Sequence, residues 1–211
     1  MPMVTDSVPP PPMAGPMPDT RIIAPASWTE RLDLDAEFGT SGPLEVDLGC
    51  GKGRFLLARA QAHPEARLLG VERLLKRLRK VDRKARRLGL HNVRLLRIES
   101  SYAIQYMLPP LSVTAFYLFF PDPWPKRRHH RRRVCTADFL AAVHAALVPQ
   151  GVFHVATDDA GYFGAIEELL CADARFAPIP AYERPPEERT DFELIFLGQG
   201  LPIQQCSVRK V

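Results

Sequence analysis

A carboxylate followed by closely spaced glycines is the first feature of this sequence that can bind a ligand. Asp47 precedes Gly49, Gly51 and Gly53, and glycines let the backbone turn sharply and lie close to a bound molecule. A dinucleotide site carries the pattern Gly-x-Gly-x-x-Gly, because the pyrophosphate sits at the N-terminus of the following helix. Here Arg54 takes the place of the third glycine, and the charge of Asp47 would repel a pyrophosphate. The loop therefore favours a ligand with a cationic amino group, and a dehydrogenase is disfavoured.

Two further acids, Glu72 and Glu99, follow the next two apolar runs. Ligands of open α/β sheets bind at the carboxyl ends of the strands, so these acids are expected at the same edge as Asp47. One carboxylate can accept hydrogen bonds from both hydroxyls of a ribose, and another can reach the edge of an adenine. An amine, a ribose and a base without phosphates describe S-adenosyl-L-methionine. The alternative is that the glycines form a helix-packing turn and the acids are ordinary caps at strand ends.

A stiff loop follows the fourth apolar run. Prolines at 121, 123 and 125 leave Asp122 and Trp124 little freedom, because proline fixes its own φ and restricts the residue before it. Such a loop beside a cofactor site positions reactive groups, and we expect Asp122 to be one of them. The alternative is a stiff connector with a packed tryptophan.

Two blocks of positive charge follow the second and fourth apolar runs. Arg73–Arg87 holds nine Lys/Arg and one acid, and Lys126–Arg133 holds six Lys/Arg, two histidines and no acid. The remaining chain has 13 basic and 23 acidic residues, so the blocks indicate a polyanionic partner such as nucleic acid. The first block has helical periodicity, and its basic face is either solvated or binds phosphates; the second is expected to be a loop. The arginines predicted to contact RNA phosphates are Arg127, Arg128, Arg131, Arg132 and Arg133.

Length and composition indicate one globular domain. The chain has 211 residues, 46% of them hydrophobic and 25% charged. Its longest apolar run, 111–120, is half of what a membrane helix needs, and no secretory signal is apparent. The four cysteines lie far apart, so neither a disulfide framework nor a metal site is expected. Residues 1–25 hold eight of the 21 prolines and are expected to be a disordered tail, leaving 26–211 as the domain of a cytoplasmic monomer or homodimer.

Apolar runs alternate with helical patterns from residue 44 onward. Five strand–helix repeats with nearly continuous apolar strands predict a doubly wound, mostly parallel, Rossmann-like α/β sheet. After residue 171 the pattern changes, and segments 191–197 and 202–208 predict a C-terminal antiparallel hairpin that closes the sheet. The predicted strands are 44–48, 67–71, 93–98, 113–120 and 152–156, and the predicted helices are 53–62, 74–88, 100–108, 136–147 and 159–171.

Several motifs of the sequence occur together and in the same order in a known family. They are Asp47–Gly53, Gly70–Glu72, Pro121–Lys126 with the basic residues after it, Ala156–Asp158 and Thr190–Glu193. Over residues 28–210 the chain resembles the bacterial tRNA (guanine-N7-)-methyltransferase family; the proline loop and the last motif are specific to it, whereas the glycine loop is widespread among methyltransferases. The resemblance implies a Rossmann-like enzyme that transfers a methyl group from S-adenosyl-L-methionine to N7 of the variable-loop guanine of tRNA, forming 7-methylguanosine.

The resemblance also implies roles for individual residues. Contacts with S-adenosyl-L-methionine are implied for Asp47, Gly49, Gly51, Glu72, Glu99 and Asp122, and Asp122 is also implied to be the catalytic residue beside the target base. Contacts with the substrate guanosine are implied for Lys126, Asp158, Thr190, Asp191, Phe192 and Glu193. The sequence departs from the family in three places: Glu99 stands where Asp is usual, Phe119 stands where Asn is common, and the proline-rich first 25 residues have no counterpart.

The expected reaction needs alignment more than proton transfer. Guanine N7 has an in-plane lone pair and no proton, so no general base is required, and Asp122 and Asp158 are expected to orient the guanine and stabilise its developing positive charge. Two other functions stay open. One is an amino-group methyltransferase on adenine or cytosine, whose Asn/Asp-Pro-Pro-aromatic loop is similar to Pro121–Trp124. The other is a non-catalytic RNA-binding module with a methyltransferase fold, against which the acids at 47, 72 and 122 argue.

Overall fold

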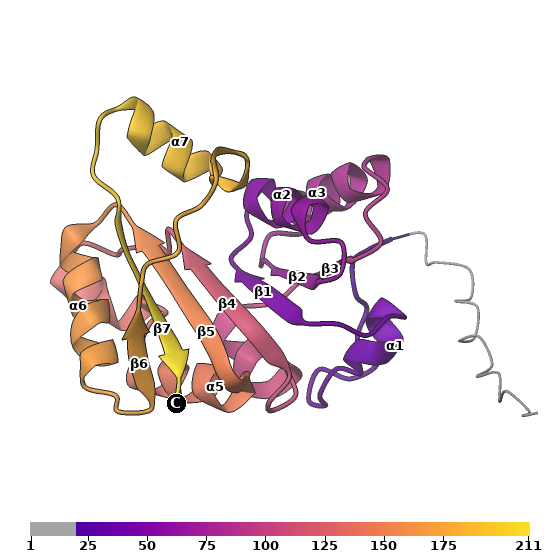
Figure 1. Ribbon diagram of the computed structural model, residues 1–211, viewed down its shortest axis with the longest axis horizontal. Helices are drawn as coiled ribbons and strands as arrows, with labels where there is room; N and C mark the ends of the chain where they lie inside the picture. The colour runs from indigo at the N-terminus through magenta and orange to yellow at the C-terminus, as the bar shows by residue number, and fades with distance from the viewer. Residues whose placement is uncertain (1–19) are drawn as a thin grey trace, which may run out of the picture.

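A seven-stranded sheet forms the centre of the structure, a computed structural model that describes residues 20–211 (Figure 1). Its strands are β1 (Leu44–Leu48), β2 (Arg67–Val71), β3 (Val93–Leu96), β4 (Val113–Phe119), β5 (Leu147–Thr157), β6 (Phe176–Ile179) and β7 (Gln204–Lys210). Their spatial order is β3-β2-β1-β4-β5-β7-β6, and β7 runs antiparallel to both of its neighbours. The predicted doubly wound, mostly parallel α/β fold is confirmed.

Helices, and on one face also the segment around Tyr182, cover the two faces of the sheet. The helices are α1 (Leu34–Phe38), α2 (Arg54–Ala62), α3 (Leu75–Arg87), α4 (Ser100–Tyr102), α5 (Ala137–Ala146), α6 (Ala160–Cys171) and α7 (Asp191–Gly198), with a π-helical turn η1 (Ala103–Met107) and 3₁₀ turns η2 (Arg127–Arg132) and η3 (Pro186–Glu188). On one face α1, η1, α5 and α6 bury their apolar side chains against the strands. On the other face α2 and α3 cover β2 and β3, and Tyr182 packs on β4 and β5. None of the helices within residues 20–211 has both the length and the apolar character required to cross a bilayer.

The predicted elements of residues 44–171 are confirmed, with shifts at some boundaries. β4 ends at Phe119 because Phe120 adopts a left-handed φ of 53°, which takes the chain out of the sheet. β5 begins at Leu147, five residues before the predicted start, and passes through Pro149 and Gly151, which obscured the strand pattern. The basic segment expected to be a loop forms the turns of η2.

The C-terminal region closes the sheet with an antiparallel strand, as predicted, but its first half is a helix. Residues 191–197, expected to be a strand, belong to α7, and β7 pairs instead with β5 and β6. The helix begins at an N-cap, since the Thr190 hydroxyl accepts a hydrogen bond from the Glu193 amide at 3.0 Å. A Thr-x-x-Glu pattern before an apolar run is a helix-start signal that the strand prediction overlooked.

The packed part of the chain begins earlier than residue 26. Ile22 forms a parallel bridge with Leu95, and the amides and carbonyls of Arg21, Ile23 and Leu95 exchange hydrogen bonds of 2.8 Å. Arg21 and Ile23 are buried, so this short segment protects the free edge of β3. The remainder of the predicted tail, residues 1–19, lies outside the described residues.

Candidate active site

A cavity of about 830 Å³ opens at the carboxyl ends of the central strands. The order of the strands reverses between β1 and β4, which is the place where open α/β sheets form their ligand crevice. The acids predicted from the sequence line this cavity, each carried by a different strand end: Asp47 on β1, Glu72 after β2, Glu99 after β3 and Asp122 after β4. The structure therefore brings all four together around one hollow.

The glycine loop exposes backbone to the cavity and also serves helix packing. Gly49, Gly51 and Gly53 all have positive φ, and the first two line the cavity. A Cβ on Gly49 would meet no atom within 4 Å, so the space beside it is open to a ligand. A Cβ on Gly53 would lie 2.7 Å from the side chain of Val81 on α3, so this glycine is required for packing. The interpretation as a ligand loop thus fits Gly49 and Gly51, and the interpretation as a helix-packing turn fits Gly53.

Asp47 is a buried carboxyl group next to another acid. Burial and, to a smaller extent, the negative charge of Glu72 together raise its pKa to about 7. No cationic side chain among the described residues offsets these two effects. A ligand that carries a positive charge into the cavity would favour the ionised form and would be held by it.

Glu72 and Glu99 hold hydrogen bonds that leave part of each carboxylate available. Glu72 is buried, accepts the Leu74 amide at 2.9 Å and pairs with Arg77 at 3.0 Å. Glu99 is exposed and caps α4 through the Tyr102 amide at 3.0 Å. The alternative, that these acids are ordinary caps at strand ends, therefore has some support at Glu99, which caps the helix that follows β3 and also lines the cavity.

The proline loop after β4 presents Asp122 at the cavity through two unusual backbone conformations. Phe120 and Trp124, on either side of it, have φ of 53° and 45°. Left-handed conformations at bulky residues cost free energy and persist where surrounding contacts enforce them, often at functional sites. Asp122 itself is exposed and lines the cavity, as does Trp124.

Two arginines of the basic segment brace this loop. The Arg133 Nε donates a hydrogen bond to the Pro123 carbonyl at 2.8 Å, and its guanidinium lies 4.5 Å from the centre of the Tyr162 ring. The Arg132 guanidinium lies 4.8 Å from the centre of the Trp124 ring, and Arg132 also lines the cavity. Arg133 is thus committed to contacts within the protein, whereas it was predicted to contact phosphate.

Helix α7 stands beyond the carboxyl ends of the central strands and closes one side of the cavity (Figure 1). Thr190, Asp191 and Phe192 line the cavity, as expected for substrate contacts. Phe192 is exposed and lies among aromatic rings, with the ring of Phe120 at 6.1 Å. The helix therefore places polar and aromatic groups on the same side of the cavity.

Three predicted substrate residues do not line the cavity. Lys126 and Asp158 are exposed outside its lining. Glu193 is buried and forms an ion pair of 2.6 Å with Arg184, whose side chain is also buried. Its motif therefore has a structural role, in which Thr190 caps α7 and Glu193 anchors it.

Comparison with known proteins agrees with this geometry. A family model described as "Putative methyltransferase" matches residues 41–193. The tRNA (guanine-N(7)-)-methyltransferase of Halorhodospira halophila is 38% identical over 187 residues, which cover 84% of this chain and 79% of that protein. The chain belongs to the tRNA (guanine-N(7)-)-methyltransferase family. The enzyme of the same name from Nocardia farcinica is 42% identical over 147 residues, or 67% of this chain, and the match spans 55% of the Nocardia protein.

Solved structures agree with the methyltransferase fold. The 16S rRNA methyltransferase KamB superposes with a TM-score of 0.64 and 18% identity, over 86% of this chain and 94% of that one. The antibiotic-resistance methyltransferase Kmr gives 0.59 and 19%, over 85% and 92%. At such low identity these matches bear on the fold of this family member and not on its substrate.

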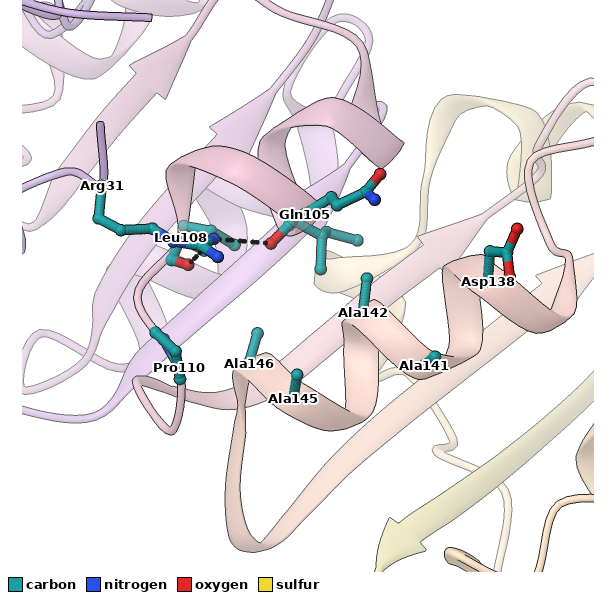
Figure 2. Close-up of a pocket in the computed structure, with 10 residues that line it drawn as sticks. Arg31, Gln105, Leu108, Pro110, Asp138, Ala141, Ala142, Ala145 and Ala146 are labelled. Atoms are coloured by element: carbon teal, nitrogen blue, oxygen red, sulfur yellow. Dashed lines mark hydrogen bonds between the residues drawn. The ribbon is translucent and has the colours of Figure 1, made fainter. Parts of the chain in front are cut away.

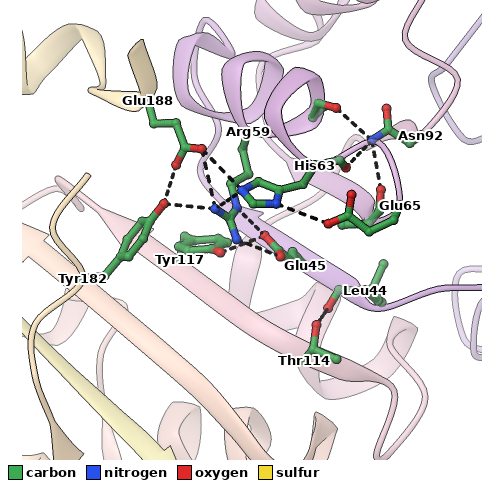
Figure 3. Close-up of polar contacts among 12 residues, drawn as sticks. Leu44, Glu45, Arg59, His63, Glu65, Asn92, Thr114, Tyr117, Tyr182 and Glu188 are labelled. Carbon is green, nitrogen blue, oxygen red and sulfur yellow. Dashed lines mark hydrogen bonds and ion pairs between the residues drawn. The ribbon is translucent and has the colours of Figure 1, made fainter. Parts of the chain in front are cut away.

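A buried polar network in this family member connects α2 to the segment before α7 (Figure 3). Arg59 on α2 pairs with Glu45 at 2.9 Å and with Glu188 at 3.5 Å. The Tyr182 hydroxyl lies 3.2 Å from Arg59 and donates a short hydrogen bond to Glu188, while Tyr117 donates to Glu45 at 2.8 Å. The network ties the helix that follows the glycine loop to residues 182–188, which lead into α7.

Several cavity residues were not predicted from the sequence. Arg77 is the most informative, because it pairs with a predicted acid, but nothing in the local pattern separates it from the other basic residues of α3. Others are Cys50, Arg54, Phe55, Ile98 and Ile195. Cys50 and Arg54 lie within or next to the glycine loop but were not singled out as ligand contacts, whereas Ile98 and Ile195 reach the cavity through tertiary packing and belong to no cofactor motif.

A second, smaller hollow of about 280 Å³ lies between η1 and α5 (Figure 2). Alanines at 141, 142, 145 and 146 form much of its α5 side, and the Arg31 guanidinium donates to the Leu108 carbonyl at 2.6 Å. None of the predicted site residues lines it. The cavity beside α7 is therefore the candidate active site.

Proposed function

We propose that this protein transfers a methyl group from S-adenosyl-L-methionine to N7 of the variable-loop guanine of tRNA, forming 7-methylguanosine. The observation that carries the proposal is the single cavity lined by Asp47, Glu72 and Asp122 at the ends of three neighbouring strands. The names of the two relatives described above support the choice of substrate. We place the reaction in the cytoplasm, where a tRNA-modifying enzyme meets its substrate.

The carboxylates in the cavity fit the amino group, the ribose and the adenine of S-adenosyl-L-methionine. When bound, this cofactor supplies an electrophilic methyl group on a sulfonium centre. The buried Asp47 carboxylate would bind its ammonium group, next to the open backbone of Gly49 and Gly51. The Glu72 carboxylate would accept the ribose hydroxyls beside its bond to Arg77, and Glu99 would meet the adenine edge with the oxygen that does not cap α4.

Asp122 would hold the target guanine in line with the methyl group. Because N7 carries its own lone pair, the protein has to supply orientation, and effective molarities of about 10⁵ M are available from positioning alone. The methylated ring gains positive charge, and a fixed carboxylate such as Asp122 stabilises it electrostatically. The exposed ring of Phe192 offers a face on which an extruded base can stack.

The remaining predicted residues divide by location. Thr190, Asp191 and Phe192 would contact the guanosine inside the cavity. Lys126 and Asp158 lie outside the lining, so we assign them contacts with tRNA next to the target nucleotide. Phosphate contacts are assigned to the exposed arginines of η2, namely Arg127, Arg128, Arg131 and Arg132, and Arg133 is assigned to bracing the proline loop.

The test is a nucleoside analysis. The protein is incubated with methyl-labelled S-adenosyl-L-methionine and an unmodified tRNA transcript, and the digest is analysed by mass spectrometry. Label in 7-methylguanosine is expected, and a transcript whose variable-loop guanine is replaced by adenine should stay unlabelled. Label in methyladenosine or methylcytidine would establish an amino-group methyltransferase instead. Binding of tRNA without any calorimetric signal for the cofactor would establish a non-catalytic RNA-binding module.

A further inference from the structure

The solvent-exposed face of α3 carries only positively charged side chains. Leu78, Val81 and Ala85 are fully buried against the sheet, and the side that faces solvent carries lysines and arginines. The helix contains one acid, Asp82, which is buried and engaged by the Arg21 amide at 2.7 Å and by Arg86 at 3.4 Å. That acid is therefore hidden from solvent and cannot balance the outer charges.

Most of these cations have no ion-pair partner within residues 20–211. Arg77 and Arg86 pair with acids. The seven others, which we call the α3 basic face, are exposed and unpaired there: Arg73, Lys76, Arg79, Lys80, Arg83, Lys84 and Arg87. Like charges four residues apart, such as Arg79 with Arg83, destabilise a helix, whereas an ordinary solvated face mixes both signs. A face of this kind is favourable when a polyanion covers it.

The α3 basic face borders the candidate active site. Arg73 and Arg77, at the beginning of α3, line the cavity, and so does Arg132 of η2. Because α3 follows β2 and η2 follows β4, and β1 lies between these strands, the two basic surfaces stand on opposite sides of the cavity. At about 1.5 Å per residue, α3 extends this charge for roughly 20 Å away from the site.

We propose that the α3 basic face binds the sugar-phosphate backbone of the tRNA as a second cationic surface across the cavity from η2. The proposal rests on the proposed function. The face contains no aromatic residue for base stacking, so it provides affinity and orientation without reading bases. An anionic membrane is disfavoured as the partner, because the apolar side of α3 is buried in the core and cannot insert into lipid.

The test neutralises two cations that lie away from the cavity. Arg83→Gln with Arg87→Gln keeps good helix formers on α3 and removes no described ion pair. The KM for tRNA is expected to rise several-fold at near-physiological salt, with kcat and cofactor affinity unchanged. The slope of log K for tRNA against log salt concentration should fall in magnitude by about 2.

The matched control removes two arginines at the other end of the sheet. Arg209 on β7 pairs with Val152, at the end opposite the cavity, and the Arg175 carbonyl accepts the Val211 amide nearby. Arg175→Gln with Arg209→Gln changes the net charge equally. It also removes the ion pair of Arg175 with Asp173, but this pair lies on the surface away from the cavity, so KM and the salt slope should stay near those of the wild type. Thermal unfolding of both variants checks that each is folded.

Three results would overturn the proposal. Equal KM values and salt slopes in the two variants would make the α3 basic face a solvated surface. Loss of binding to phosphatidylserine vesicles in the α3 variant, with tRNA binding intact, would assign the face to a membrane. The two proposals can fail separately. If the wild type forms no 7-methylguanosine, the proposed function fails, and direct titration with tRNA still decides whether α3 binds RNA. Titration curves that coincide for the wild type and the α3 variant would refute the α3 proposal.

Discussion

Asp47 is buried, and the charged side chain that acts on its pKa, Glu72, is also an acid, so both effects favour the protonated carboxyl. In the folded protein its pKa is about 7, whereas in the unfolded chain the carboxyl ionises near its ordinary value. Between those two pH values the folded state holds a proton that the unfolded state has lost. The stability of the unliganded protein therefore falls as the pH rises from about 4 to about 7, and it stays lowered above that range.

Asp47→Asn is expected to stabilise the unliganded protein at pH 8, because the variant does not have to ionise a buried group. The gain is at most about 4 kcal/mol and should vanish at about pH 3, below the ordinary Asp pKa, where both states of the wild type are protonated. Chemical denaturation at the two pH values measures it. Calorimetry at pH 8 should show that the variant has lost affinity for S-adenosyl-L-methionine. A variant that is less stable than the wild type at pH 8 would contradict the assignment.

Asp122→Asn tests the group proposed beside the target base. The side chain is exposed, so the fold and the tRNA dissociation constant should hardly change. Loss of the fixed negative charge should lower kcat by about 10²-fold or more. Single-turnover methylation of tRNA measures the effect. Asp138→Asn, an exposed aspartate in the first turn of α5, is the matched control and should retain wild-type turnover.

Among the secondary-structure elements, α7 depends most clearly on contacts with distant parts of the chain for its position. Its N-terminus is capped by Thr190, its Glu193 pairs with the buried Arg184, and the segment before it is held to α2 through Arg59 and Glu188. The outer side of α7 contributes little to the core, as Ile195 and Leu197 are about half exposed. The helix is therefore positioned by its polar anchors more than by apolar packing.

Glu188→Gln should loosen α7 without touching the cavity. Glu188 is buried, and the substitution removes the negative charge that pairs with Arg59 at 3.5 Å and accepts the Tyr182 hydroxyl. Because Arg59 keeps its closer pair with Glu45, the expected cost is about 1–3 kcal/mol. We expect faster hydrogen exchange in residues 182–198 and a higher KM for tRNA, with a smaller effect on cofactor affinity. Glu187→Gln changes the exposed neighbour in the same turn and should leave exchange rates unchanged. Equal protection of α7 in the two variants would show that the network does not hold the helix.

At the scale of the whole molecule, the cavity joins the two halves of the sheet. Asp47 and Glu72 come from the β1–β3 half, and Asp122 comes from the β4 side. A ligand that contacts both halves binds the folded protein and not the unfolded chain, so its binding energy adds to the stability of the whole domain. The same arrangement exposes the site to the two basic surfaces of α3 and η2.

S-adenosyl-L-homocysteine, the demethylated form of the cofactor, should therefore raise the unfolding temperature of the entire domain. At a hundred times its dissociation constant it contributes about 2.7 kcal/mol, which corresponds to roughly 5–10 °C for a protein of this size. Differential scanning calorimetry measures the shift as a single transition. The Asp47→Asn variant should show no shift at the same concentration, and a shift equal to that of the wild type would remove Asp47 from the cofactor site.

The sequence was sufficient to predict the sheet and the four acids at its carboxyl edge. Continuous apolar runs alternating with helical patterns force a covered parallel sheet, and in such a sheet the ends of successive strands meet at one edge. The acids at 47, 72, 99 and 122 therefore had to share a neighbourhood, and they line one cavity. The family was also apparent from motifs, because each motif is a run of neighbouring residues and can be recognised without knowing the fold.

Tertiary structure decided what depends on segments that are distant in the chain. The apolar run 191–197 fits a strand or a helix by composition, and Arg184, which pairs with the buried Glu193 of this run, lies outside it. Arg133 was indistinguishable from its neighbours until Pro123 and Tyr162 were placed around it. A residue's type limits which interactions it can make, but the partner that satisfies it is set by three-dimensional packing. This is why the acids that line the cavity could be predicted from the sequence, whereas the supports of α7 and of the proline loop could not.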